Sequence, residues 1–313
     1  MTTKATPPKS RSAPGKRRAA AASGTVSLTL LNGMAGFEFE RALDQHLAWG
    51  IRLLDLKDCI FGKSIQDLTD EEVVLAHTMV SERRLQVATL STTLFHPDVE
   101  RGEAFFAETQ LAHVARVVDL ARVLRPRCIR LLAAQTQRRK ELTGSTEYLQ
   151  AQHPWLIPMY GAAVDRIHAA GFLTVIENEV DRCIWSRPPE IVGFFEALGR
   201  AKKVGFMWDI QNLWEMGTFP SLPLYQALRP LIAQIHVKGG MAEFPGGRLK
   251  WRSTLADASW PVLDILRAVV RDGVSPVICL NPSHGAPQPG YDYANEVQRD
   301  IEFMRGSIPE IAR

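Results

Sequence analysis

The chain has 313 residues, 46% of them hydrophobic, and a formal net charge of +3. This length suits one large barrel or two ordinary domains, and no run approaches the ~18 consecutive apolar residues of a membrane span. Four scattered cysteines without a CxxC pair indicate free thiols and a cytoplasmic protein.

The first 24 residues form a compositionally distinct segment. They carry six lysines and arginines and no acid, which leaves a formal net charge of −3 on the rest of the chain. Without aromatic residues, this segment cannot bury enough apolar area to offset the entropy of ordering, so we predict a disordered basic tail. A twin-arginine export signal at Arg17 and Arg18 is the weaker interpretation, because the apolar run that follows suits a first strand better. The acidic body disfavours nucleic-acid binding by the folded part.

From Thr25 onward, short apolar or β-branched runs alternate with segments of helical period, which predicts repeated βα units. The eight strand candidates are TVSLTLL from Thr25, IRLLDLK from Ile51, LQVATLS from Leu85, RCIRLLA from Arg127, FLTVIEN from Phe172, VGFMWDI from Val204, LIAQIHV from Leu231 and PVICLNP from Pro276. Eight units in about 290 residues predict a single (β/α)8 TIM barrel over residues 25–313. A doubly wound open sheet is the alternative, but the first strand lacks the GxGxxG fingerprint of its nucleotide-binding form.

Three helices have clear predicted ends. Helical patterns end at Gly50, before Pro126 and at Gly171.

Two predicted loops are longer than the usual connections and have a length that commonly serves as a lid. They are residues 134–146, after the fourth strand, and residues 239–257, after the seventh. Both follow the carboxyl end of a strand, which is the catalytic side of a barrel.

Polar residues occur where the later strands end. Residues two apart on a barrel strand share a side, so Glu177, Asp209, His236 and Asn281 are expected to point toward one mouth. Converging oxygen and nitrogen donors of this kind make a divalent-cation site. The structural alternatives are a helix N-cap for Asp209 and a satisfied core histidine for His236.

Motifs along nearly all of residues 25–306 resemble those of a known family. They are DLKDCIFGKSIQDLTDEE after the second strand, VIENEV, WDIQNLWEMG and QIHVKG at the fifth to seventh strands, and NPSHG at the eighth. This set resembles the sugar phosphate isomerase/epimerase family, with its xylose isomerase-like TIM barrel, in the superfamily that includes AP endonuclease family 2. The resemblance implies that Glu177, Asp209, His236 and Asn281 bind Mn²⁺ or Mg²⁺, with Zn²⁺ or Co²⁺ as alternatives.

Two positions depart from the family pattern. Gly239 stands where the family usually has an acid, and Asn281 replaces a glutamate. An asparagine oxygen can coordinate a metal, but it carries no charge and accepts no proton at ordinary pH. Metal binding is therefore expected to be weaker, and Glu177 remains the clear base, with Glu179 as a replacement for the missing partner. One-base proton transfer through an enediolate, or β-elimination from a 3-keto sugar, is still chemically open.

Further candidates are expected to bind substrate. Lys57 and Lys238 can hold a phosphate, a carboxylate or a developing enolate oxygen, unless they are ordinary solvated or ion-paired lysines. Asn212 can bond a substrate hydroxyl. Trp185 and Trp251 can stack on a sugar ring, although loop aromatics more often pack a lid onto the barrel.

These residues favour an enzyme: a divalent-metal-dependent sugar or polyol isomerase or epimerase, or a lyase on a keto sugar, with Glu177, Glu179 and Lys238 as catalytic residues. The alternative is a catalytically degenerate or partner-dependent barrel with a binding or subunit role. DNA repair is disfavoured, because a three-zinc site needs more histidines at strand ends than His96, His236 and His284. The expected partner is a small sugar or polyol, without a membrane, and a homo-oligomer is left open.

Overall fold

The computed structural model describes residues 26–287 and 292–311. The predicted tail 1–24 and Thr25 lie outside the described residues. Within the described residues, eight parallel strands close into a barrel in the order β1-β10-β7-β6-β5-β4-β3-β2, which confirms the TIM barrel. The barrel strands are β1 Ser27–Leu31, β2 Leu53–Leu56, β3 Gln86–Ser91, β4 Cys128–Leu132, β5 Leu173–Glu177, β6 Val204–Asp209, β7 Ile232–Val237 and β10 Val277–Leu280.

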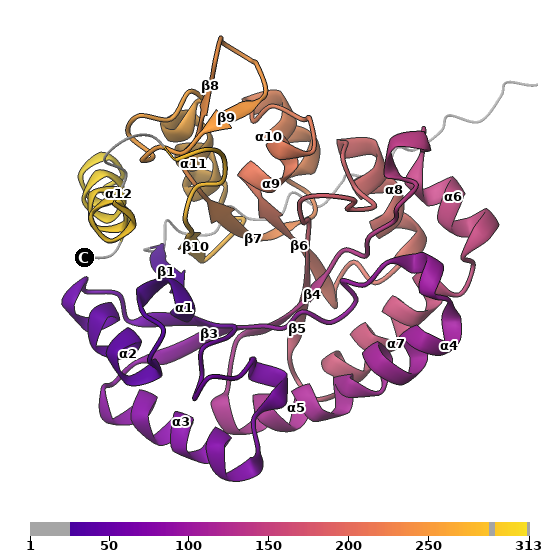
Figure 1. The fold of residues 1–313 in the computed structure, drawn as a ribbon, viewed down its shortest axis with the longest axis horizontal. Coiled ribbons are helices and arrows are strands. Elements are labelled where there is room, and N and C mark those ends of the chain that lie inside the picture. The colour runs from indigo at the N-terminus through magenta and orange to yellow at the C-terminus, as the bar shows by residue number, and fades with distance from the viewer. Residues whose placement is uncertain (1–25, 288–291, 312–313) are drawn as a thin grey trace, which may run out of the picture.

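Helices surround the strands (Figure 1). They are α1 Asn32–Ala35, α2 Phe39–Ala48, α3 Asp70–Glu82, α4 Glu103–Phe106, α5 His113–Leu124, α6 Ser145–Gln152, α7 Leu156–Ala169, α8 Pro188–Leu198, α9 Ile210–Glu215, α10 Leu222–Leu228, α11 Val262–Asp272 and α12 Tyr293–Ser307. The long helix predicted before Pro126 is divided into α4, a π-helical segment at Ala107–Leu111, and α5.

Local sequence signals account for several boundaries. A capping box starts α3, since Thr69 accepts the N–H of Glu72 and the Glu72 side chain accepts the N–H of Thr69. Gly199 ends α8 with a φ of 64°, a left-handed conformation that glycine adopts at little cost. Strand β6 is buried along its whole length, as expected for a barrel strand covered by helices outside and side chains inside.

The connection after β7 has more structure than a loop. Met241–Ala242 (β8) and Leu249–Trp251 (β9) pair as an antiparallel ribbon, which stands at the rim of the barrel (Figure 1). The loop predicted over 239–257 therefore contains two short strands. The connection 134–146 contains a 3₁₀ turn at Arg139–Glu141, and its last two residues already belong to α6.

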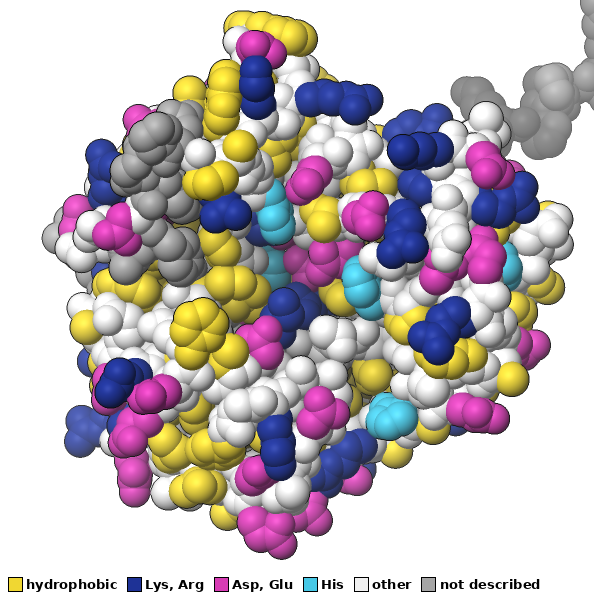
Figure 2. Space-filling model, in the orientation of Figure 1, with side chains coloured by type: hydrophobic (Ala, Val, Ile, Leu, Met, Phe, Trp, Pro, Cys, Tyr) yellow, Lys and Arg dark blue, Asp and Glu magenta, His cyan; other side chains and the backbone are white. Residues whose placement is uncertain are grey.

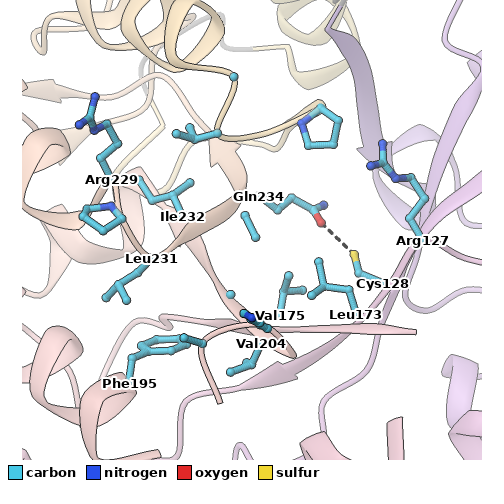
Figure 3. Close-up of a pocket in the computed structure, with 18 of the residues that line it drawn as sticks. Arg127, Cys128, Leu173, Val175, Phe195, Val204, Arg229, Leu231, Ile232 and Gln234 are labelled. Atoms are coloured by element: carbon cyan, nitrogen blue, oxygen red, sulfur yellow. Dashed lines mark hydrogen bonds between the residues drawn. The ribbon is translucent and has the colours of Figure 1, made fainter. Parts of the chain in front are cut away.

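A large cavity of about 1210 Å³ opens at the amino ends of the strands. Figure 3 shows Phe195, Leu231 and Ile232 around it, with Cys128 donating to Gln234 Oε1 at 3.1 Å. In the described structure its lining contains none of the four predicted metal ligands. We assign no function to it, because barrel enzymes place their chemistry at the opposite end.

Two sequence expectations concern the protein's surroundings. Cys59, Cys128, Cys183 and Cys279 are free thiols, as predicted. Across residues 26–287 and 292–311, no helix combines the length and apolar character needed to cross a membrane.

The last helix fixes the β7 connection through one buried acid. Asp300 Oδ1 on α12 accepts the N–H of Leu255 at 2.7 Å, and only 7% of the aspartate is exposed. Burial, reinforced by the charges of Glu296 and Asp257, raises the pKa of Asp300 to about 7. The folded protein therefore holds a proton on Asp300 that the unfolded chain releases near its ordinary pKa of 3.8.

This difference predicts a pH-dependent stability. Between pH 4 and 7, roughly, the folded state binds the proton and the unfolded state does not, so this group lowers the free energy of unfolding as pH rises. Asp300→Asn should remove that loss, and at pH 8 it should be more stable than the wild type by about 1 kcal/mol or more. Thermal denaturation at pH 4.5 and pH 8 tests this, and an equal effect at both pH values would contradict it.

Candidate active site

The carboxyl ends of three neighbouring strands bring Glu177, Asp209 and His236 together. One ligand atom of each lies within 4.8 Å of those of the other two, and all three residues are buried. Asn281 follows β10, and its Nδ2 lies 3.0 Å from His236 Nδ1. The structure thus gathers all four predicted ligands, and the first three form a buried group that could hold a metal ion.

His236 lies between two acids. Its Nδ1 is 2.9 Å from Glu177 Oε1, whereas its Nε2 is 3.5 Å from Asp55 Oδ2 on β2. Asp55 is in turn held by the hydroxyl of Ser91. Burial lowers the pKa of His236, but Glu177, Cys279 and Asp55 together outweigh burial and raise that pKa well above its ordinary value. The imidazole is therefore a buried cation at neutral pH in this arrangement.

Arg130 on β4 pairs with the same glutamate. Its Nη1 lies 2.6 Å from Glu177 Oε2, and both side chains are almost fully buried. Burial would raise the pKa of Glu177, yet the charges of His236 and Arg130 outweigh it and hold the pKa below its usual range. Glu177 is consequently ionised, with a cation on each of its two oxygens.

Lys238 performs the corresponding role for Asp209. Its Nζ lies 2.7 Å from Asp209 Oδ2, donates to Asn212 Oδ1 at 2.7 Å, and lies 2.9 Å from His284 Nε2. Burial and the charge of Lys238 lower the pKa of His284 to about 4, so this ring is neutral and can accept the hydrogen bond. The alternative of an ion-paired lysine therefore describes Lys238 in this structure.

The two interpretations of Asp209 are compatible. Its Oδ1 accepts the N–H of Asn212 at 2.9 Å and caps α9, which is the structural alternative considered for this residue. Its Oδ2 faces Lys238 and the candidate metal group. The side chain of Asn178 holds the Asp209 backbone through both its N–H and its carbonyl, at 3.0 Å each.

Most of these groups line a pocket of about 120 Å³; His236 and Asp55 are not in its described lining. Its lining residues are Leu31, Met34, Lys57, Arg130, Glu177, Glu179, Asp209, Asn212, Lys238, Asn281, Pro282 and His284. Figure 2 shows acidic, basic and histidine side chains gathered in the central hollow of this face. Sites for drug-sized ligands measure about 300–1,000 Å³, so this pocket suits a small polar molecule. The structure thus brings Lys57, Glu179, Lys238 and Asn212 to one place.

The two predicted stacking tryptophans are placed elsewhere. Trp185 is fully buried and packs against Phe194, Phe195 and Phe206, with ring centroids 4.8, 5.8 and 6.1 Å away. Its assignment to substrate binding is corrected, because no part of the ring reaches the pocket. Trp251 lies on β9, with Lys250 Nζ 4.6 Å from its ring centroid, and is absent from the described lining of the pocket.

The structure explains the missing acid at Gly239. A Cβ at this position would lie 1.8 Å from the carbonyl oxygen of Ser253 and 2.6 Å from that of Thr254. The backbone after the β8–β9 ribbon thus occupies the space that a side chain would need. Gly239 is therefore a steric requirement of the folded β7 connection.

Three site residues escaped the sequence analysis, and each had a signal. Arg130 is a charge in the middle of an otherwise apolar run, CIRLLA. Asp55 shares the side of its strand with Lys57, two residues later. His284 follows the eighth strand and was only a minor candidate from the sequence, whereas the pocket contains it as a neutral partner of Lys238.

Comparison with known proteins identifies the fold. No family model matches the chain, and no curated protein matches it. A xylose isomerase-like TIM barrel protein from Mycobacterium smegmatis, solved in complex with magnesium, is similar at 15% identity and a TM-score of 0.66, over 90% of this chain and 96% of that one. The chain therefore has the xylose isomerase-like TIM barrel fold, as its motifs implied.

Two further structures carry enzyme names. The 3-keto-D-glucoside 4-epimerase YcjR from E. coli is 10% identical, with a TM-score of 0.67 over 90% of this chain and 99% of that one. The probable 3-DHS dehydratase AsbF from Bacillus anthracis is 14% identical, with a TM-score of 0.67 over 89% of this chain and 98% of that one. At these identities the likeness establishes the fold alone.

The donor set is chemically suited to a divalent ion. Two carboxylates and an imidazole converge, and His236 Nε2 has no hydrogen-bond partner among the described residues, although Asp55 lies close by. A carboxylate behind a ligating histidine is the usual arrangement at protein metal sites. The basic side chains on Glu177 and Asp209 compete with such an ion for the same oxygens.

Removing Arg130 should expose the cost of burying Glu177. Arg130→Met leaves one oxygen of a buried carboxylate without its cation, so we expect the free energy of unfolding to fall by about 3 kcal/mol. Adding Glu177→Gln should recover part of that loss, as measured by urea denaturation. Arg139→Met, in the buried pair with Glu190 at 2.8 Å, is the control that Glu177→Gln should not rescue. A double variant no more stable than Arg130→Met would contradict the pairing.

Proposed function

We propose that this chain is an enzyme that moves a proton on carbon in a small sugar or polyol, as an isomerase or epimerase, or as a lyase on a keto sugar. One observation carries the proposal: Glu177 and Glu179 share a small pocket with Lys57, Arg130 and Lys238 at the carboxyl ends of the strands. Carboxylates that accept a proton beside cations that stabilise an oxyanion are the components of enolisation chemistry.

Glu179 is the better-placed general base of the two glutamates. Its side chain accepts hydrogen bonds from neutral donors, the N–H of Val180 at 3.3 Å and the Asn212 amide at 3.4 Å. Burial and the charge of Glu177 raise the pKa of Glu179, which brings it toward the range where a general base works best. Glu177, held between Arg130 and His236, is the poorer proton acceptor and the better ligand.

The remaining pocket residues suit substrate binding. Lys238 and Lys57 supply positive charge for a carbonyl oxygen that becomes an enediolate. Asn212 lines the pocket and stays a predicted contact for a substrate hydroxyl. Such a pocket favours a sugar or polyol as partner; cytoplasmic location and the homo-oligomer stay predictions.

A divalent cation, Mn²⁺ or Mg²⁺ with Zn²⁺ or Co²⁺ as alternatives, would be held by Glu177, Asp209, His236 and the amide oxygen of Asn281. When bound, it would supply Lewis-acid stabilisation of negative charge on substrate oxygen. The chain's own residues would then orient the substrate and transfer the proton. The magnesium complex of a protein with the same fold supports this assignment.

A binding or subunit role without catalysis is the second candidate. It is favoured by the neutral Asn281 and by the backbone that fills the space beside Gly239, because both remove acids from the mouth of the barrel. Proton exchange on substrate carbon separates the two functions.

Solvent exchange tests the proposed base. Aldoses, ketoses, inosoles and 3-keto glycosides in D₂O with added Mn²⁺ should gain deuterium at carbon, detected by mass spectrometry. Glu179→Gln should slow this exchange by roughly 10²–10⁴-fold, the usual contribution of a general base. Glu196→Gln, at the opposite cavity, is the matched control and should exchange normally. Full activity of Glu179→Gln together with an inactive Glu177→Gln would move the base to Glu177, and exchange on none of the four compound classes would favour the non-catalytic role.

Restoring the strand-eight acid tests the ligand set. Asn281→Glu adds a third carboxylate to the candidate ligand set, after Glu177 and Asp209, so the dissociation constant for Mn²⁺ should fall by about tenfold or more. Isothermal titration calorimetry measures this directly. An unchanged affinity would show that position 281 is not a ligand.

A further inference from the structure

We propose that the ammonium group of Lys238 occupies the position beside Asp209 that a metal ion would take. A divalent ion would then bind Asp209 only by displacing this ammonium group. The inference concerns the pocket of the proposed function, but its test uses metal binding alone.

The first support is the coordination of the ammonium group. A lysine ammonium has three hydrogens, and Nζ of Lys238 has three partners at 2.7–2.9 Å: Asp209 Oδ2, Asn212 Oδ1 and His284 Nε2. The lysine is 5% exposed, and Asp209 has no exposed surface. A buried ammonium with this full set of partners is fixed in place, unlike a solvated lysine that swings through the pocket.

The second support is the balance of charge. Glu177 is paired with Arg130, and Asp209 with Lys238. Each of these two candidate ligands therefore already has a cation. A divalent ion added here would leave unbalanced positive charge, because Asn281 is neutral and position 239 has no room for an acid.

The third support is the way Lys238 can withdraw. Asn212 and His284 hold the ammonium without contributing charge, and both line the same pocket. When an ion takes Asp209, these two acceptors can keep the lysine close by, where its charge would face a substrate oxygen. The four-carbon stem of lysine permits such a shift without movement of the backbone.

The experiment compares Mn²⁺ affinity in the full chain and two variants of equal charge. Lys238→Met removes the competing ammonium and should lower the dissociation constant by at least about tenfold, since one nearby charge is worth that much or more in a buried site. Lys57→Met removes a charge from the same pocket, but Lys57 Nζ is 3.9 Å from Asp58 rather than on a candidate ligand. This control should shift the constant by less than about threefold.

A second readout separates competition from misfolding. Mn²⁺ should raise the melting temperature of Lys238→Met more than that of the wild type, because the metal replaces the lost cation at Asp209. If the methionine variant does not fold, Lys238→Gln keeps hydrogen-bond donors without the charge and should show the same tighter binding.

The inference fails if the Lys238 variants bind Mn²⁺ no more tightly than the wild type, or if Lys57→Met tightens binding equally. Tighter binding by Lys238→Met in a protein that exchanges no substrate proton would support the inference while rejecting the proposed function.

Discussion

The mouth of this barrel depends on keeping ionised groups neutralised in pairs away from water. An isolated carboxylate in such a place would cost several kcal/mol, or would take up a proton instead. Here Glu177 has Arg130 and His236, Asp209 has Lys238, and Asp55 has His236 and Ser91. The charges come from five strands, so the network can form only when the barrel closes. Closure of the barrel and pairing of the buried charges therefore stabilise each other.

The same network decides what the pocket can do. Glu177 is paired with Arg130 and His236, which lower its pKa, and Asp209 is paired with Lys238. These pairings suit metal ligands better than proton acceptors. Glu179, two residues further along the chain, has neutral hydrogen-bond partners and a raised pKa, and in the function we propose it transfers the proton. The proposal thus gives these two glutamates different roles because their surroundings differ, as is common for acid and base residues in enzymes.

The β7 connection shapes the site from outside. Its ribbon, β8 and β9, leads the chain back over Gly239, where the carbonyls of Ser253 and Thr254 leave no room for a side chain. Asp300 on the last helix anchors the following residues through Leu255. An acid at position 239 and this path of the connection exclude each other, so the departure from the family motif and the local fold have one cause.

The sequence by itself determined the barrel, its strands and the convergence of Glu177, Asp209, His236 and Asn281. The period of a strand and the alternation of its side chains are local properties, so the sequence shows them without any knowledge of tertiary contacts.

Only the tertiary structure decided which charged side chains form pairs. Nothing local to Arg130 or Lys238 says which carboxylate each will bind, because Arg130 and Glu177 are 47 residues apart and become neighbours only through strand register. The burial of Trp185 could likewise not be inferred from its position in a loop, because the three phenylalanines that surround its ring come from α8 and β6. Periodicity fixes which side of a strand a residue faces, whereas the pairing of charges depends on distances that only the closed barrel sets.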